Sequence, residues 1–392
     1  MDLISRKKCN GCQGCVQICP ISAIRMEKDI YGFEYPSIDK ARCIECGKCN
    51  DVCSARRDVE PSLHLRCGAA YSKNKRIKYN GSSGGLFGLF AQKVIANGGK
   101  VYGAALDEKL KLKTVSAKNE EELEPLYKSK YLLCDTNNSF SLIKQDLEEG
   151  IDVLYCSSPC QVYALKLYLG KDYSNLITVD FVCHGVGSQE LFDKSIKYIE
   201  AKKDIRIEKY SFRYKKESNT SSHYYYYRGT SKNKQKESSG LYIFDPYYLA
   251  YENRLACRDS CYDCHFASEN RVSDITIGDF HNINHYYQKI DRFAGVSMFV
   301  CNTQKGLDAF NAINEKLEIF DMEWDVVKEN NRFQNDERPK VRRTEFLQSL
   351  KNDKFETTVK KYLHPSQLWM NILYYYSPKF VRVIAFKLFG RQ

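Results

Sequence analysis

Cysteines with regular spacing are the residues of this sequence that are best suited to chemistry. The segment CNGCQGCVQICP (9–20) contains four of the 17 cysteines, spaced C-x2-C-x2-C-x3-C. Thirty-four residues later, CIECGKCNDVCS (43–54) repeats this spacing at one constant offset. Thiolates in such runs can hold an iron–sulfur cluster, bind zinc or form disulfides.

The repeat favours iron–sulfur clusters. It has the spacing of bacterial ferredoxins, in which three cysteines of a run bind one 4Fe-4S cluster and the fourth binds the other. Structural zinc usually takes two C-x2-C pairs and has no use for the additional cysteines. Disulfides need an oxidising compartment, and the first apolar stretch is too short to direct export. The predicted ligands are Cys9, Cys12, Cys15 and Cys53 for the first cluster, and Cys43, Cys46, Cys49 and Cys19 for the second.

The composition limits the partners of the chain. Its 392 residues include 60 Lys and Arg against 49 Asp and Glu, a net charge of +11, and 43% are hydrophobic. This length predicts two or three domains. The basic balance favours an acidic partner, an anionic substrate or a membrane surface, and the scattered lysines argue against nucleic-acid binding. Because no window reaches the roughly 18 apolar residues that span a bilayer, a cytoplasmic location is expected.

Beyond residue 66 the hydrophobic pattern alternates between short strands and helices. Strands are predicted at 67–72, 100–106, 151–156 and 176–185, and helices at 85–97, 139–149 and 160–169. This alternation is typical of an α/β domain with a mainly parallel sheet. The tyrosine-rich pattern from 205 to 250 predicts an antiparallel β extension. The predicted architecture is an α+β ferredoxin-like domain fused to this α/β domain, followed by a helical C-terminal region.

A second set of cysteines lies outside the two runs. Cys160 (SSPCQ) and Cys183 (VCHG) each follow a predicted parallel strand, at the edge where open α/β sheets bind ligands. Cys257, Cys261 and Cys264 (CRDSCYDC) form a further group. A C-x2-C pair with two thiols from neighbouring loops would make a third cluster site, with zinc or unligated thiols as alternatives. Four others are predicted to be core residues, namely Cys67, Cys134, Cys156 and Cys301.

Six segments in order resemble one known family. They are NGSSGGLFGLFAQKVIANGGKVYGA, YKSKYL, SSPCQVYAL, VDFVCHGVGS, CRDSCYDCHFASENRVSDITIGDF and GVSMFVCNTQKG. Together they resemble the beta subunits of coenzyme F-420 (deazaflavin) hydrogenases and dehydrogenases. A ferredoxin domain fused ahead of such blocks resembles the deazaflavin-oxidising dehydrogenase subunits and the flavin/iron–sulfur divinyl reductases of chlorophyll synthesis.

The resemblance implies a domain order and a set of cofactors. A two-cluster ferredoxin domain (1–58) would precede a flavin-binding block (66–145), a block with flavin and third-cluster contacts (146–310) and a helical region (320–392). The flavin would be FAD, with FMN as the alternative. The matching motifs imply that Cys160, Cys183, Cys261 and Cys264 hold the third 4Fe-4S cluster, with Cys257 in reserve.

Three departures from the expected patterns bear on these sites. Ser54 stands where a second proline is expected after the cysteine run, although proline is not a ligand. SSPCQ has Ser158 where the family usually has threonine, which would alter a hydrogen bond near the flavin or cluster. GDFHN has His281 where an aromatic residue often follows, which would reshape the substrate side.

The flavin contacts are predicted from a glycine turn and a nearby KSKY segment. GSSGG (81–85) opens an apolar helix, so its backbone N–H groups could hold a pyrophosphate, although a serine there is equally a helix N-cap. The candidate cofactor contacts are Ser82, Ser83, Gly84, Gly85, Ser129 and Lys130. Lys130 and His184 are also the candidate catalytic residues, His184 as a proton relay or as a hydrogen-bond donor to a carbonyl group.

These cofactors predict an oxidoreductase that passes electrons between the clusters and a flavin. The flavin would reduce or oxidise a small organic substrate or the deazaflavin coenzyme, and a ferredoxin or a partner oxidoreductase subunit would exchange electrons with the clusters. The alternative is an electron-transfer subunit that feeds a separate enzyme. Residues 379–391 alternate basic and apolar residues, which predicts either peripheral membrane contact or a terminal helix docked on the core.

Overall fold

The fold is known from a computed structural model. It describes residues 2–216, 219–281, 283–287, 290, 295–331, 333–335 and 339–364. The C-terminal segment 379–391, predicted to contact a membrane or the core, lies outside these residues. Within the described part of the chain, no helix combines the length and the apolar character needed to cross a bilayer.

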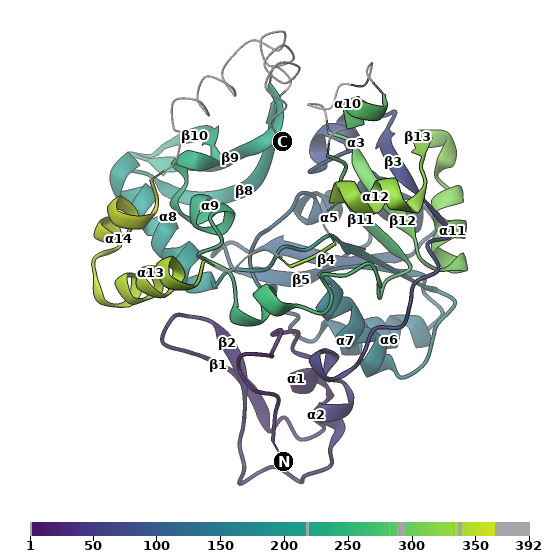
Figure 1. Ribbon diagram of the computed structural model, residues 1–392, viewed down its shortest axis with the longest axis horizontal. Helices are drawn as coiled ribbons and strands as arrows, with labels where there is room; N and C mark the ends of the chain where they lie inside the picture. Colours follow the sequence, from purple (N-terminus) through teal and green to yellow (C-terminus); the bar gives the residue numbers. More distant parts are fainter. Residues whose placement is uncertain are drawn as a thin grey trace.

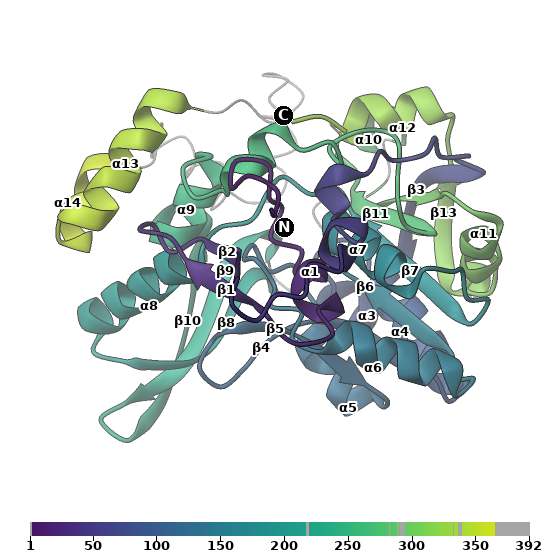
Figure 2. The same cartoon turned by 90° about the horizontal axis from the view of Figure 1, so that it is seen from below.

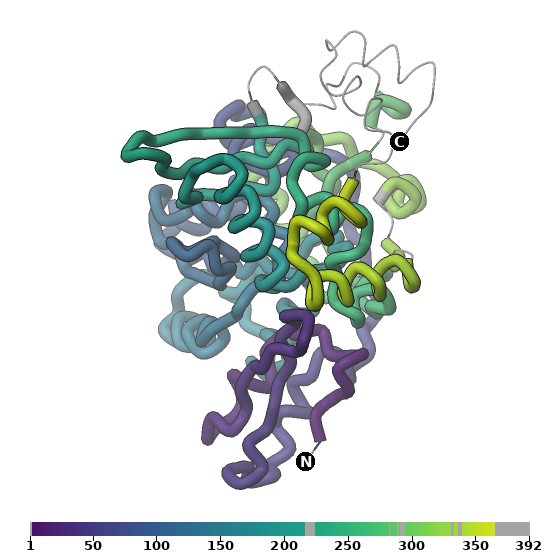
Figure 3. The backbone as a smooth tube through the Cα atoms, turned by 90° about the vertical axis from the view of Figure 1, so that its left-hand side faces the viewer, coloured from purple at the N-terminus to yellow at the C-terminus, as the bar shows by residue number. Residues whose placement is uncertain are grey.

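The N-terminal domain is a pseudo-symmetric duplication, as the two cysteine runs predict. Its elements are α1 (Gly14–Ile18), β1 (Ile24–Lys28), β2 (Glu34–Ile38) and α2 (Lys48–Asp51), and β1 pairs antiparallel with β2. The backbone repeats across the 34-residue offset, because Gly11 and Glu45 are both left-handed, as are Gln13 and Gly47. In Figure 3 this domain projects from the rest of the molecule and carries the N-terminus.

The larger domain is built on one eight-stranded sheet with the order β13-β3-β12-β11-β7-β6-β4-β5. The strands are β3 (Arg66–Ser72), β4 (Lys100–Leu106), β5 (Leu112–Ala117), β6 (Val153–Cys156), β7 (Leu176–Phe181), β11 (Ile275–Asp279), β12 (Ser297–Cys301) and β13 (Leu317–Asp321). The central strands β11, β7, β6 and β4 are parallel, while β5, β12 and β13 run antiparallel to their neighbours. The predicted parallel sheet is therefore confirmed at its centre, and its antiparallel flanks make it a mixed sheet.

Helices cover both faces of this sheet (Figure 1). The helices are α4 (Leu86–Ala96), α6 (Ser139–Glu148), α7 (Pro159–Leu169) and α11 (Gln304–Asn311). Alternate residues of β6 face opposite layers: Leu154 packs in the core with α4 and α11, whereas Val153 and Tyr155 pack in the core with α6 and α7. Burial on both faces explains why these strands are continuous apolar segments.

The antiparallel extension predicted from 205 to 250 is confirmed. It comprises β8 (Arg206–Lys216), β9 (Asn219–Ser231) and β10 (Lys234–Leu241), which form a separate three-stranded sheet. One aromatic core joins this sheet to α8 (Gln189–Lys203) and α9 (Pro246–Glu252), with Phe192, Phe212 and Tyr247 fully buried in it. The helices α13 (Lys340–Asn352) and α14 (Phe355–Tyr362) close this side, in agreement with the predicted helical region.

A buried ion pair links the sheet to the loop that carries the second cysteine set. Arg271 lies 3.1 Å from Asp180 of β7, and both side chains are almost fully buried. Arg271 also donates hydrogen bonds to the carbonyl oxygens of Phe266 (2.9 Å) and Phe181 (3.2 Å). Thr276 of β11 donates to the same carboxylate at 2.6 Å. This network fixes the loop after Cys264 against the carboxyl end of β7 and the beginning of β11.

Replacing Asp180→Ala is expected to destabilise the fold by about 3–5 kcal/mol, because it leaves the Arg271 guanidinium buried without its anion. The control is Asp172→Ala, which removes an exposed partner of Lys305 and should cost about 0–1 kcal/mol. Denaturant midpoints of the two variants provide the measurement. Equal midpoints would contradict the structural role assigned to the buried pair.

Candidate iron–sulfur sites

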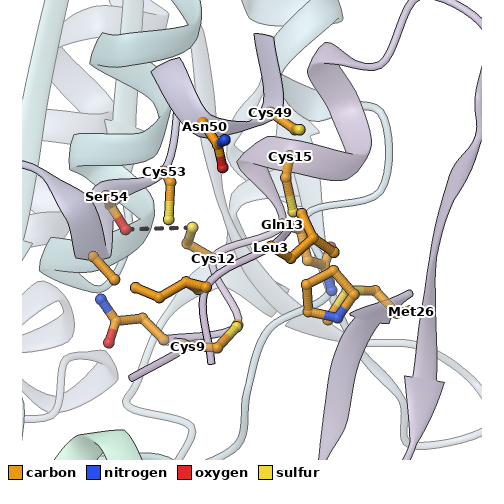
Figure 4. A pocket seen from close by; sticks show the side chains of 15 residues that line it. Leu3, Cys9, Cys12, Gln13, Cys15, Met26, Cys49, Asn50, Cys53 and Ser54 are labelled. Atoms are coloured by element: carbon orange, nitrogen blue, oxygen red, sulfur yellow. Dashed lines mark hydrogen bonds between the residues drawn. The ribbon is translucent and has the colours of Figure 1, made fainter. Parts of the chain in front are cut away.

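A cavity in the N-terminal domain collects the first predicted ligand set. Its lining includes Cys9, Cys12, Cys15 and Cys53, together with Cys49 (Figure 4). Cys53 comes from the second run, yet it lines the cavity of the first. The fourth cysteine of the second run thus lies where the crossed ferredoxin arrangement requires it.

A second cavity collects the other set. It is lined by Cys19, Cys43, Cys46 and Cys49, so the fourth cysteine of the first run reaches the second cavity. Cys46 is exposed, whereas Cys9 and Cys12 of the first cavity are buried. The two cavities therefore differ in their access to solvent, with the second nearer the surface.

Burial shapes the chemistry of the first cavity. It raises the pKa of the Cys12 and Cys15 thiols and raises that of Cys53 to about 11, and neighbouring thiols add to the shifts at Cys15 and Cys53. Such thiols stay protonated until iron displaces the protons, because cluster binding requires thiolates. The Ser54 hydroxyl donates a hydrogen bond to Cys12 Sγ at 3.3 Å. Ser54, which stands where a proline is expected, thus contacts a predicted ligand directly.

The second cysteine set gathers at the carboxyl edge of the sheet. Cys160 begins α7 after β6, Cys183 follows β7, Cys261 lies in the 3-10 helix η4 (Asp259–Asp263), and Cys264 follows it. Burial raises the pKa of the Cys160 thiol most, and then Cys12, Cys264 and Cys183 raise it further. The same neighbours act on Cys261, whose pKa is raised by burial and then by Cys257, Cys183 and Cys264. Cys160 and Cys264 share a core with Cys12 of the first cavity, and Cys261 packs against Gly185, two residues after Cys183.

Close grouping around a single ion is seen at neither cysteine set. Within the described part of the chain, no three His, Cys, Asp or Glu side chains converge on one metal position. Zinc and a third 4Fe-4S cluster therefore both stay open as interpretations of the second set. The reserve residue Cys257 is buried with its thiol 3.8 Å from the His184 carbonyl oxygen.

Three hydrogen bonds join the first cavity to the second cysteine set. Arg258 Nε and Ser260 Oγ both donate to the carbonyl oxygen of Cys9, at 2.7 and 2.9 Å. His265, next to Cys264, lies 3.1 Å from the carbonyl oxygen of Ser54 through Nε2. These residues were not predicted from the sequence; their only signal was adjacency to the cysteines, in CRDSC and DCH. α1 also contacts α7 at this junction (Figure 2).

The glycine turn predicted to hold a phosphate uses its polar groups within the protein. Gly84 N–H donates to Ser297 Oγ at 2.8 Å, and Ser83 Oγ donates to the Val296 carbonyl at 2.7 Å. Ser82 Oγ accepts hydrogen bonds from the N–H and the hydroxyl of Ser129, at 2.7 and 3.0 Å. A side chain at position 84 would meet the Ala70 carbonyl oxygen at 2.4 Å. Close packing inside the fold thus accounts for glycine at position 84.

Basic side chains surround this turn. Arg213 of β8 donates to the Ser82 carbonyl at 3.2 Å and pairs with Asp279 at 2.9 Å, while Lys215 donates to the carbonyl oxygens of Ser83 and Lys78. Burial, and after it the nearby Arg213, lowers the pKa of Lys215 to about 7. Burial also lowers the pKa of Lys130 to about 7. Arg213 and Lys215 were not predicted, although their i, i+2 spacing in a strand places them on one face.

Asp279 and the two predicted catalytic candidates, Lys130 and His184, make local contacts. Burial alone would raise the pKa of Asp279, but Arg213 and then His281 outweigh it, so the carboxyl is held well below its usual range. Lys130 Nζ donates to the carbonyl oxygens of Pro125 and Tyr127, at 2.8 and 2.7 Å. His184 lies beside Cys183, and its carbonyl oxygen faces the Cys257 thiol.

The hydrogen bond from Ser54 predicts a measurable redox effect. Donation to a cluster thiolate stabilises the more negative, reduced state, so Ser54→Ala should lower the potential of one ferredoxin-type cluster by tens of millivolts, the equivalent of roughly one hydrogen bond. Redox titration followed by EPR measures the shift. Ser62→Ala, which removes a hydroxyl bonded to Arg271, is the control, and an equal shift in both variants would refute the assignment.

Two family models and one solved structure match parts of this chain. Residues 8–56 match the 4Fe-4S dicluster domain, which confirms the prediction of a two-cluster domain, and residues 151–323 match the family described as the C terminus of the coenzyme F420 hydrogenase/dehydrogenase beta subunit. One solved structure, the F420-reducing [NiFe] hydrogenase complex from Methanosarcina barkeri, covers 77% of this chain and 93% of its own at 15% identity, with a TM-score of 0.43.

Two curated relatives are subunits of H(2):CoB-CoM heterodisulfide,ferredoxin reductase. The protein from Methanothermobacter marburgensis is 25% identical over 226 residues, covering 49% of this chain and 31% of the relative. The protein from Methanothermobacter thermautotrophicus is 24% identical over 226 residues, which again cover 49% of this chain and 31% of the relative. The match thus spans about a third of the relatives' length. The chain is thus an iron–sulfur protein in which a segment that matches the 4Fe-4S dicluster domain precedes a segment that is similar to the C terminus of coenzyme F420 hydrogenase/dehydrogenase beta subunits.

Proposed function

We propose that this protein is an iron–sulfur oxidoreductase that passes electrons singly through three 4Fe-4S clusters to an organic redox group. The observation that carries the proposal is the junction between Cys12 and Cys160. Each thiol belongs to a different cysteine set, and the two residues pack in one core. The side chains of Arg258 and Ser260 donate hydrogen bonds to the Cys9 carbonyl oxygen and fix the same junction.

The order of the clusters follows from burial. The second cavity has the exposed Cys46 in its lining, and the side chain of Ile44 beside it is 61% exposed. A redox partner can therefore approach the second cluster, whereas the first is enclosed against the larger domain. Electrons would pass between the partner, the second cluster, the first cluster and the third.

A packed path leads from the second cysteine set to the basic side chains around the glycine turn. Tyr251 Oη donates to the Gly185 carbonyl at 3.3 Å, close to Cys183. The Tyr251 ring stacks on Tyr131 at 4.5 Å, and Arg213 donates to the Tyr131 hydroxyl at 3.1 Å. The organic group is proposed at the end of this path because the basic side chains there outnumber the acidic ones.

The charge balance supports an anionic ligand at this position. Lys128, Lys130, Arg213 and Lys215 lie in or beside the site, and Asp279 is the carboxylate that pairs with one of them. A flavin phosphate would offset this positive charge, and these side chains, rather than the glycine turn, would hold it. A bound flavin exchanges electron pairs with an organic substrate and single electrons with clusters. Lys130, whose pKa is about 7, can hold or release a proton at Nζ near neutral pH.

A second function has its own support in the exposed end of the N-terminal domain. The chain would then be a subunit that moves electrons between a reduced coenzyme and a separate enzyme. The curated relatives are named as parts of a heterodisulfide,ferredoxin reductase. Turnover of the isolated chain with an artificial electron donor separates the two: only an enzyme complete in itself reduces its substrate without partner subunits.

The cluster count is tested by iron analysis of anaerobically purified protein. About twelve irons per chain and one flavin are expected for three clusters. Cys160→Ser should reduce the iron to about eight and remove one EPR signal, because it removes a ligand of the third cluster. Cys301→Ser, at a fully buried core position, should leave the count unchanged. About eight irons and no flavin in the native chain would contradict the proposal.

The lysines predict a pH dependence of flavin binding. Lys215 is progressively neutral above its pKa of about 7, and an anion raises that pKa when it binds, so binding takes up a proton. Affinity for FAD should therefore fall as pH rises from 6 to 9, by up to about tenfold per unit for each lysine. Lys215→Gln should weaken binding at pH 6 and flatten the profile, as measured by flavin fluorescence. The control is exposed Lys234→Gln, and an unchanged slope in Lys215→Gln would exclude the role.

A further inference from the structure

Arg258 is the largest of the fully buried side chains in the described structure, with 0% of its surface exposed. Its Nε donates to the Cys9 carbonyl at 2.7 Å, and its Cζ lies 4.0 Å from the centre of the Tyr35 ring. Among the described residues, its Nη1 and Nη2 atoms have no hydrogen-bond partner. A buried charge without an anion is strongly unfavourable, so these two nitrogens point to an anion that the polypeptide itself does not supply.

Arg343 differs from Arg258 in having a carboxylate partner. It is also buried, but it pairs with Asp259 at 2.9 Å and donates to the Cys257 carbonyl at 2.7 Å. A carboxylate thus sits one residue after Arg258 and is bound to the other arginine. Two buried guanidinium groups lie in or against the segment 257–264, and the one that is hydrogen-bonded to Cys9 of the first cavity has no carboxylate partner among the described residues.

The pseudo-symmetric repeat provides a second observation. Gly11 and Glu45 occupy equivalent positions of the two runs, and both have a left-handed backbone. A Cβ on Gly11 would lie 3.1 Å from Arg258 Cζ and 2.9 Å from Leu133. Glycine at position 11 therefore leaves space for the guanidinium, whereas the equivalent Glu45 is exposed at the second cavity. The two halves of the repeat therefore differ at the position that packs against Arg258, which is glycine in the first run and glutamate in the second.

We propose that Arg258 is the shared counter-charge of two clusters, the first ferredoxin-type cluster and the third. The inference rests on the proposed function for the presence of those clusters. A 4Fe-4S cluster with four thiolate ligands is a net anion and gains negative charge with each electron. A buried cation beside it stabilises the reduced state, because charges interact strongly in a low-dielectric interior.

This placement gives the electron path a direction. Arg258 raises the potentials of the first and third clusters but not that of the second, which has Glu45 in the equivalent place. One electron from a redox partner would reduce the second cluster and then move to the first, with no proton or bond involved. The positioning role of Arg258 is thus to favour electron transfer into the larger domain.

The test compares Arg258→Gln with two controls by redox titration followed by EPR. Arg258→Gln should lower the reduction equilibrium constant of the first and third clusters at least tenfold, which is about 59 mV for a one-electron couple. The second cluster should not shift and is the internal reference. Arg258→Lys retains the charge and should restore most of the potential. Ser260→Ala removes the other donor to Cys9 without changing charge, and its shift should be clearly smaller.

Each outcome decides the matter. The inference is overturned if Arg258→Gln keeps its native iron content and its reduction equilibrium constants stay within twofold of the native values. It is also overturned if Arg258→Gln and Ser260→Ala shift the potentials equally. If Arg258→Gln loses iron, the iron contents of Arg258→Met and Arg258→Lys decide between charge and packing. Iron that is retained only in Arg258→Lys supports the counter-charge. Iron that is lost in all three variants assigns Arg258 a packing role. A native chain without iron would contradict the proposed function itself, whereas native iron with unmoved potentials contradicts this inference alone.

Discussion

Hydrogen bonds to two backbone carbonyl groups join the N-terminal domain to the segment that carries the second cysteine set. The carbonyl oxygens of Cys9 and Ser54 accept hydrogen bonds from the segment that carries the second cysteine set. This junction lies between the first N-terminal cavity and the larger domain. Because both carbonyls belong to residues in or next to the cysteine runs, the interface that docks the domain also sets the separation of the cysteine sets.

The central sheet supplies the other side of the junction. Parallel strands end at one edge, so Cys160 after β6 and Cys183 after β7 arrive as neighbours. The Arg271–Asp180 pair then secures the loop after Cys264 against the same edge. This buried network thus ties the loop after Cys264 to the strand that precedes Cys183. Stability of the core and placement of the thiols depend on the same ion pair.

The two blocks implied by the family resemblance are interleaved in the structure. Strands β3, β4 and β5 come from residues 66–145, and they share one sheet with strands from later in the chain. β3 lies between β12 and β13, far from β4 in the sheet order. The boundary near 145 therefore separates segments of sequence, while the hydrophobic core is continuous across it.

The sequence by itself determined the two-cluster domain, because ligand spacing within a short run leaves little freedom for other chemistry. Apolar periodicity likewise determined most strands and helices, since burial on one or both faces of an element appears in local order. Only the tertiary structure decided which distant groups meet. It placed Arg258 against Cys9 and Arg213 against Ser82, and it engaged the glycine turn in contacts within the protein. Such contacts join residues more than a hundred positions apart, and long-range packing leaves no periodic signal in a single sequence.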